Sequence, residues 1–198
     1  DLFTTDKEFY IRLLAMALPI ALQNLINFSV AMADTLMVSR LGVSTLAGVN
    51  LANKFSTIFN LFTFGLGGGA NVLIAQYWGQ KDKKSIRQVM SIMYRALLIG
   101  SLFFSVVAIF FPMQAMQIFT KDVAAQLAGA EYLRIIGFSY FFAGFATATT
   151  TVWRSIGAVN IALVVYLSSL ATNVFLNWVF IFGNLGAPAL GAAGAAIG

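Results

Sequence analysis

The sequence predicts an all-α membrane protein, built as a polytopic bundle of transmembrane helices. Hydrophobic residues make up 60% of the chain and charged residues 10%, whereas an ordinary soluble domain carries roughly 25% charged residues. Five uncharged stretches also reach the length of about 20 residues that an apolar helix needs to cross a bilayer. They cover residues 13–33, 55–80, 96–120, 135–153 and 155–198, and the last can hold two helices.

The helices expected from these stretches follow one another at short intervals. The first is preceded by an amphipathic start, in which Thr5 and Glu8 have the spacing of a capping box and which we expect to lie on the membrane surface. Near the C-terminus the segment GNLGAPALG predicts a loop, and AAGAAIG then begins a sixth apolar segment that the chain end interrupts. Residues 1–198 are thus expected to form one bundle, with helices at about 13–39, 46–78, 89–111, 128–153 and 161–182 and the start of another at about 189.

The basic residues lie between the hydrophobic spans, and their distribution predicts the orientation. Lysine and arginine in short loops resist translocation, and the loop GQKDKKSIRQ is the most basic one. A cytoplasmic N-terminus puts eight basic residues inside: Lys7, Arg12, Lys81, Lys83, Lys84, Arg87, Arg95 and Arg154. Only Arg40, Lys54, Lys121 and Arg134 then lie outside. The net charge of +5 therefore indicates a lipid bilayer as the partner and no nucleic acid.

The chain contains neither cysteine nor histidine. Their absence from the sequence excludes disulfide scaffolds, thiol nucleophiles, the usual zinc sites and histidine proton relays. No cofactor is expected.

One carboxylate, Asp34, interrupts the otherwise apolar first span. Placing a charged side chain in hydrocarbon costs at least about 2.5 kcal/mol, so its presence needs a reason. Gln23, Asn27 and Asp34 project within roughly 40° of each other on a helix, and such a polar stripe must face protein or water. A structural role, as a hydrogen-bonded contact between helices, is one explanation. A functional role is favoured because Asp34 has no charged partner within reach on its own helix, and Gln23 and Asn27 are then expected to line a substrate cavity.

A buried carboxylate is stable when it takes up a proton or binds a cation with neutral oxygen ligands. The fifth span supplies such oxygens in TNVFLNWVF, where Asn173 and Asn177 are four residues apart and share a helix face. Paired asparagines also clamp helices together, so both roles stay open for them. Asp34, Asn173 and Asn177 are therefore candidates for a coupling site for Na⁺ or H⁺, with no metal beyond that Na⁺.

The glycine-rich segment FGLGGGANVLIAQYWG lies inside the second span. It lacks the Lys-Ser/Thr ending of a phosphate-binding loop, so its small residues are expected either to allow close helix contact, as at Gly68, or to form a flexible point for bending. Lys54 and Arg154, near the ends of spans, are interpreted as anchors that extend toward the membrane surface.

With these residues placed, the chain resembles the multidrug and toxic compound extrusion (MATE) transporters. The resemblance is carried by LPIALQNLINFSVAMADTLMVSRLGVSTLAGVNLA, FGLGGGANVLIAQYWGQKDKK, WRSIGA and NVFLNWVFIFGNLGAPALGAAGAAIG. It implies a twelve-helix secondary antiporter of two six-helix lobes in the cell inner (plasma) membrane, exporting organic, often cationic, compounds in exchange for Na⁺ or H⁺. This chain is similar to the N-terminal lobe, whose partner is then the C-terminal half of the same transporter.

The resemblance also implies roles for single residues. Asp34 matches the acidic residue central to cation coupling, and Asn173 and Asn177 match two polar positions of the same site. Some family members carry aspartate at the position of Asn177, so the choice of ion stays open.

The sequence supports three other functions less well. A lipid-linked oligosaccharide flippase of the same superfamily would need basic residues in its cavity to bind a pyrophosphate, and none is visible at mid-span. A membrane-embedded enzyme would need a second acid, a nucleophile with a base, or a metal site. A channel would need a filter and a symmetric assembly. The sequence favours the cation-coupled exporter, in which a change of charge at Asp34 alters helix packing and drives alternating access.

Overall fold

The computed structural model describes residues 7–39 and 43–197, and within them it shows helices joined by short turns. The helices are α1 (Lys7–Val38), α2 (Val43–Gly79), α3 (Lys83–Phe110), α4 (Pro112–Gln117), α5 (Val123–Ser155), α6 (Val159–Phe182), a 3₁₀ turn at Asn184–Gly186 and α7 (Ala192–Ile197). Of the described helices, α1, α2, α3, α5 and α6 are long and apolar enough to cross a membrane. The all-helical membrane fold class is confirmed.

The observed helix ends differ from the expected ones in places. α1 is a single helix from Lys7, so the expected amphipathic start is part of it, while Thr5 lies outside the described residues. α3 begins at Lys83 and α5 at Val123, each earlier than expected, because Asp82 and Asp122 cap them. The short α4 was not expected; it follows from Pro112, which occupies the first turn of a helix readily.

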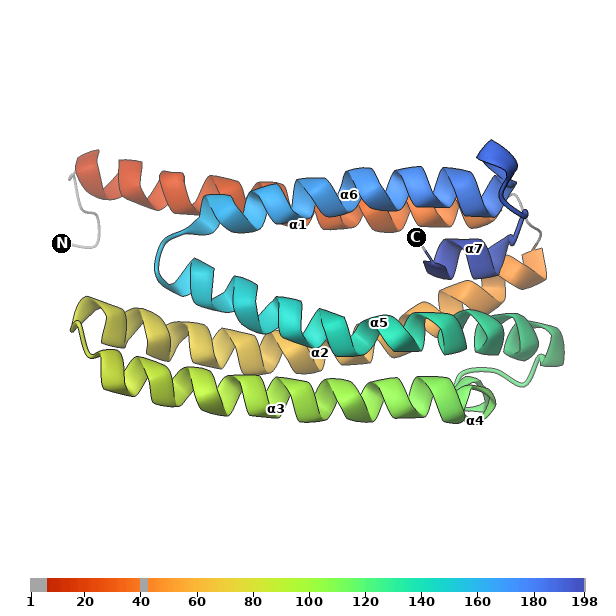
Figure 1. The fold of residues 1–198 in the computed structure, drawn as a ribbon, viewed down its shortest axis with the longest axis horizontal. Helices are drawn as coiled ribbons and strands as arrows, with labels where there is room; N and C mark the ends of the chain where they lie inside the picture. The colour runs from red at the N-terminus through yellow and green to blue at the C-terminus, as the bar shows by residue number, and fades with distance from the viewer. Residues whose placement is uncertain (1–6, 40–42, 198) are drawn as a thin grey trace.

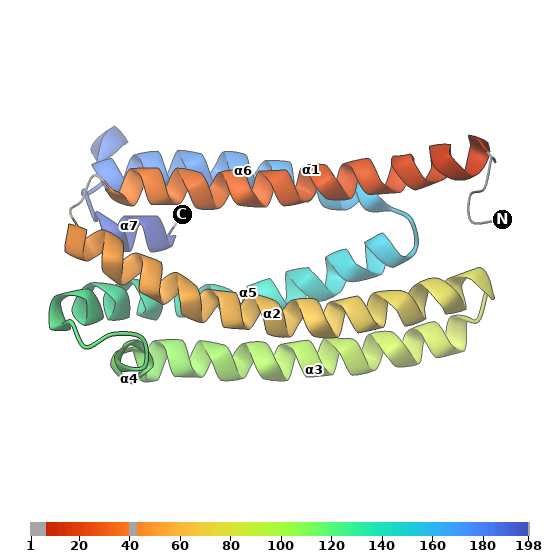
Figure 2. The same cartoon turned by 180° about the vertical axis from the view of Figure 1, so that it is seen from behind.

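The long helices are arranged in two layers. α5 packs against α2 and α3 in one layer, and α1 packs mainly against α6 in the other (Figures 1 and 2). The short α7 contacts both α5 and α6, near the end of the bundle at which α2 begins. The start of α1, the α2–α3 turn and the α5–α6 turn lie at the opposite end (Figure 1). The expected cytoplasmic residues Lys7, Lys81 and Arg154 are thus at the same end of the molecule.

The core of the α2–α3–α5 layer is aromatic. Phe55 and Phe59 of α2 pack against Phe104 of α3 and Tyr140 of α5, with ring centroids 4.7 to 6.0 Å apart. The Tyr140 hydroxyl lies 2.7 Å from the Ser56 hydroxyl, so the one polar atom of this cluster is hydrogen-bonded. This packing joins α2, α3 and α5 into one layer.

Glycines outside the glycine-rich segment permit the closest helix contacts in this layer. A Cβ atom at Gly48 would lie 2.7 Å from both the Ala125 carbonyl oxygen and the Gly129 nitrogen of α5. A Cβ atom at Gly68 would meet nothing within 4 Å. The prediction that Gly68 allows close helix approach is therefore wrong, and Gly48 has that role.

Asp82 caps α3 in the turn between α2 and α3, next to Lys81, Lys83 and Lys84. Its Oδ1 accepts hydrogen bonds of 3.1 Å from the Lys84 and Ser85 backbone N–H groups, and the Ser85 hydroxyl donates to Oδ2 at 2.6 Å. These bonds, with that from the Ser85 hydroxyl the largest, hold the pKa of Asp82 below its ordinary value of 3.8. Since the folded-state pKa is lowered, the stabilisation is present above the unfolded-state pKa and is lost as the pH falls through the folded-state value.

We expect Asp82→Ala to lower the unfolding temperature of the full-length protein in detergent at neutral pH, because two backbone N–H groups lose their acceptor. The difference from the unmodified protein should shrink at pH values below 3.8, because the Asp82 carboxylate takes up a proton first in the unfolded state and, at still lower pH, in the folded protein. Asp82→Ser, which keeps an oxygen acceptor, should retain most of the stability. Equal unfolding temperatures for Asp82→Ala and the unmodified protein would show that the cap does not stabilise α3.

Candidate functional site

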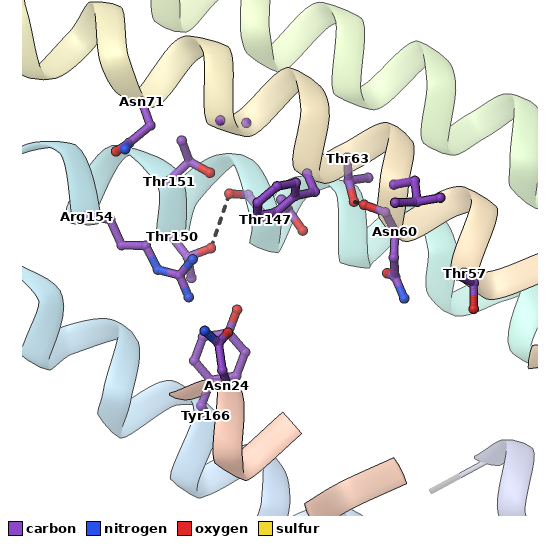
Figure 3. A pocket seen from close by; sticks show the side chains of 14 residues that line it. Asn24, Thr57, Asn60, Thr63, Asn71, Thr147, Thr150, Thr151, Arg154 and Tyr166 are labelled. Atoms are coloured by element: carbon purple, nitrogen blue, oxygen red, sulfur yellow. Dashed lines mark hydrogen bonds between the residues drawn. The ribbon is translucent and has the colours of Figure 1, made fainter. Parts of the chain in front are cut away.

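A polar cavity of about 530 Å³ lies between the two layers. Fourteen of the residues that the structure describes line it, from α1, α2, α5 and α6 (Figure 3). Its volume is in the range of sites for small organic molecules. Because its lining includes threonine, asparagine and arginine side chains, this cavity between the apolar helices can accommodate a polar molecule.

The α2 wall of the cavity is a stripe along one helix face. Its polar members recur at helical spacing: Thr57, Asn60, Thr63 and Asn71. Leu61 and Phe64 add an apolar portion, and Gly67 and Gly68 leave room where side chains would otherwise project. The glycine-rich segment thus opens the cavity.

The α5 wall repeats the same pattern with hydroxyl groups and one charge: Thr147, Thr150, Thr151 and Arg154. The Thr150 hydroxyl donates to the Ala146 carbonyl at 2.9 Å, and on α2 the Thr63 hydroxyl donates to the Asn60 carbonyl at 3.0 Å. Because the hydroxyl protons of these two residues are used within their own helices, their oxygens remain able to accept hydrogen bonds.

Arg154 extends from α5 to the other layer and joins three helices. Its Nε donates to Oε1 of Gln23 in α1 at 3.1 Å, and one terminal nitrogen donates to the same oxygen. The guanidinium carbon also lies 5.7 Å from the centroid of the Tyr166 ring of α6. The interpretation of Arg154 as a membrane-surface anchor is therefore wrong. Its side chain lines the cavity (Figure 3).

Gln23 and Asn27 were both predicted to line the cavity, and the structure describes the side chain of Gln23 only. Gln23 is fully buried and holds Arg154, but its neighbour Asn24 lines the cavity in its place. Gln23 is thus a support for the wall, which corrects the prediction that it forms the wall. Asn27 belongs to α1, and its side chain lies outside the described part of the structure.

The expected coupling residues lie on the two helices of the second layer. On α6, the Asn177 side-chain amide donates to the Asn173 oxygen at 3.2 Å, and Asn177 is fully buried while Asn173 is half-buried. Asp34 belongs to α1, which packs against α6, but its side chain lies outside the described part of the structure. The structure brings the two asparagines together, and the three-residue coupling site stays a prediction.

The asparagine pair is near the cavity without lining it. Tyr166 lines the cavity and precedes Asn173 by seven residues, two turns of α6, so the two share a helix face about 10 Å apart along the axis. An ion-dependent change at the pair would therefore act on the helix that closes one side of the cavity.

The threonine and asparagine stripes were not singled out from the sequence. The signal that identifies them is the spacing 147, 150, 151 and 154, which places three hydroxyls and a guanidinium on one face of a long apolar helix. Single polar residues of this kind are common in membrane helices, but two facing stripes are not explained by helix association alone.

Comparison with known proteins agrees with this architecture. The family model MatE matches residues 19–179. The "Probable multidrug resistance protein NorM" of Rhizobium meliloti is 32% identical over 187 residues, which cover 93% of this chain and 39% of that protein. The "Uncharacterized transporter YisQ" of Bacillus subtilis is 27% identical over 193 residues, covering 97% of this chain and 42% of that protein.

A solved structure of the MATE multidrug transporter DinF-BH has a TM-score of 0.83 at 26% identity, covering 94% of this chain and 42% of that chain. The chain therefore belongs to the MatE family, as the sequence resemblance predicted. It spans about two fifths of the length of the curated relatives it matches, which fits one lobe of a two-lobe transporter.

Proposed function

We propose that this chain is one lobe of a secondary active exporter that moves small organic compounds out of the cell in exchange for Na⁺ or H⁺. The observation that carries the proposal is the polar cavity between the layers, in a chain that belongs to the MatE family. The partners in this proposal are the C-terminal half of the same transporter, the lipid bilayer and the organic substrate. The protein is not an enzyme in this proposal, and the N-terminus lies on the cytoplasmic side of the inner membrane.

The two-layer arrangement supports alternating access. α1 and α6 pack mainly on each other, so this pair can shift as a unit against the aromatic-cored layer of α2, α3 and α5. Asp34 is on α1, and Asn173 and Asn177 are on α6. Protonation of Asp34, or binding of Na⁺ to it, would change the charge within this pair and favour one of two packings. The cavity would then lose its affinity for substrate on the exporting side.

Flux measurements on the full-length transporter in proteoliposomes test this proposal. A fluorescent organic substrate should move against its own gradient when a Na⁺ or pH gradient is imposed, with a rate that saturates and with counter-movement of the ion. Movement that never saturates and does not respond to either ion gradient would contradict a coupled carrier and would favour a channel.

The flippase alternative gains one supporting observation. It needs basic residues in the cavity, and Arg154 supplies one. Within the described lining no second basic residue accompanies it, whereas a pyrophosphate carries several negative charges. The exporter is therefore the better-supported function.

A further inference from the structure

We propose that the cavity selects organic anions, and that Arg154 binds the acidic group of the substrate. This inference rests on the proposed function, in which the cavity is the substrate site. It departs from the family-based expectation of cationic substrates and concerns the charge that this lobe recognises.

Arg154 has donors left for a ligand. A guanidinium carries five N–H donors, and Gln23 accepts from Nε and from one terminal nitrogen. No other acceptor is bonded to Arg154 within the described residues. Because Gln23 is fully buried, it fixes the plane of the guanidinium, and a pre-oriented fork of this kind matches the geometry of a carboxylate.

The surroundings favour an anion over a cation. Arg154 is the only charged residue in the described lining of the cavity. The carboxylates with described side chains are Glu8, Asp82, Asp122 and Glu131, and none of them lines the cavity. Asp34 is eleven residues beyond Gln23 on α1, a separation of about 16 Å along the helix axis. An organic cation near Arg154 would therefore meet repulsion, whereas an acid would find a counter-charge.

The neighbours of Arg154 complete a site for an acid with an organic body. The Asn71 and Asn24 amides carry further N–H donors and line the cavity with it (Figure 3). Phe64 and Leu61 lie further along α2 and offer apolar contact. A monocarboxylate with an aromatic ring fits both this chemistry and the volume of about 530 Å³.

Three ligands of one shape and different charge test the proposal. Equilibrium dialysis of the full-length protein in detergent, without any ion gradient, would compare 2-naphthoate, 2-naphthamide and 2-naphthylmethylammonium. We expect the carboxylate to bind at least about tenfold more tightly than the amide, and the ammonium most weakly, as a charge-assisted pair requires. Arg154→Gln should abolish this order and Arg154→Lys should keep part of it, because the charge remains and the fork is lost.

Arg134→Gln is the matched control, since Arg134 is an exposed arginine of the same helix and does not line the cavity. It should leave the order of affinities unchanged. The inference would be overturned if the amide or the ammonium bound as tightly as the carboxylate, or if none of the three bound. Both results come from the unmodified protein, so the test holds even if Arg154→Gln fails to fold. Gradient-driven flux of the same ligands is a separate measurement. Coupled transport without a preference for the acid would contradict this inference and support the proposed function. Acid-selective binding without coupled transport would support this inference and contradict the proposed function.

Discussion

Asp34→Asn is expected to abolish ion-driven transport while leaving the folded protein in the membrane. Asparagine keeps the shape of aspartate and much of its hydrogen bonding, but it has neither a titratable proton nor a negative charge. Without either, the imposed gradient has no group at this position through which to act. We expect the efflux rate per folded transporter to fall at least about tenfold, the equivalent of about 1.4 kcal/mol in the activation barrier.

Two companions and a control sharpen this result. Asn173→Ala and Asn177→Ala should weaken the ion dependence less severely, because each removes one neutral oxygen. Asn177→Ala should also lower stability more, since Asn177 is fully buried. Thr35→Val is the control on α1, because the Thr35 hydroxyl donates only to the Ala31 carbonyl of its own helix at 2.8 Å. Transport by Asp34→Asn at the unmodified rate, under the same gradient, would show that Asp34 is structural.

The fold could be predicted because a bilayer leaves few alternatives. An apolar segment of the required length must satisfy its backbone hydrogen bonds internally, so composition and span length together predict membrane helices. Helix ends were less predictable because they depend on local caps. Asp82 extends α3 to Lys83, and Gly157, with a φ of 82°, permits the turn after α5.

The site was predicted less completely, and Arg154 shows why. An arginine near the end of a span can extend toward water or fold inward, and the sequence is the same in both cases. The inward position depends on Gln23, which is 131 residues away, and on Tyr166 of a third helix. Such a contact is set by how the layers pack, which helical periodicity does not determine.

Helical spacing is more informative for the aromatic residues of α5 than for Arg154. Tyr140 is buried and hydrogen-bonded to Ser56, while Phe138 and Phe142 are exposed on the outer surface. Helical spacing places Phe138 and Phe142 on one face, four residues apart. Periodicity therefore predicts which residues share a face better than it predicts what that face contacts.

Gly48→Leu is expected to prevent folding, whereas Gly68→Leu is expected to fold and to impair transport. At Gly48 even a Cβ atom would lie 2.7 Å from two backbone atoms of α5, and backbone atoms of a packed helix cannot move aside cheaply. Overpacking of a well-packed contact costs about 1 to 3 kcal/mol or more, a large share of the stability of a single lobe. At Gly68 the space is open because it belongs to the cavity, so leucine would occupy the volume that a substrate needs.

The alanine variants separate helix packing from side-chain size. Gly68→Ala should be neutral or slightly stabilising, since alanine is favoured over glycine by about 1 kcal/mol inside a helix. Gly48→Ala gains the same helix propensity, but its added methyl group would push α2 away from α5. It should therefore reduce the yield of monodisperse protein in size-exclusion chromatography. If Gly48→Ala were recovered at the unmodified yield with an unchanged unfolding temperature, the contact with Gly129 would not determine how closely the two helices pack. If Gly68→Leu lost folded protein as severely as Gly48→Leu, the glycine-rich segment would be a packing surface after all, and the cavity would not be open at this position.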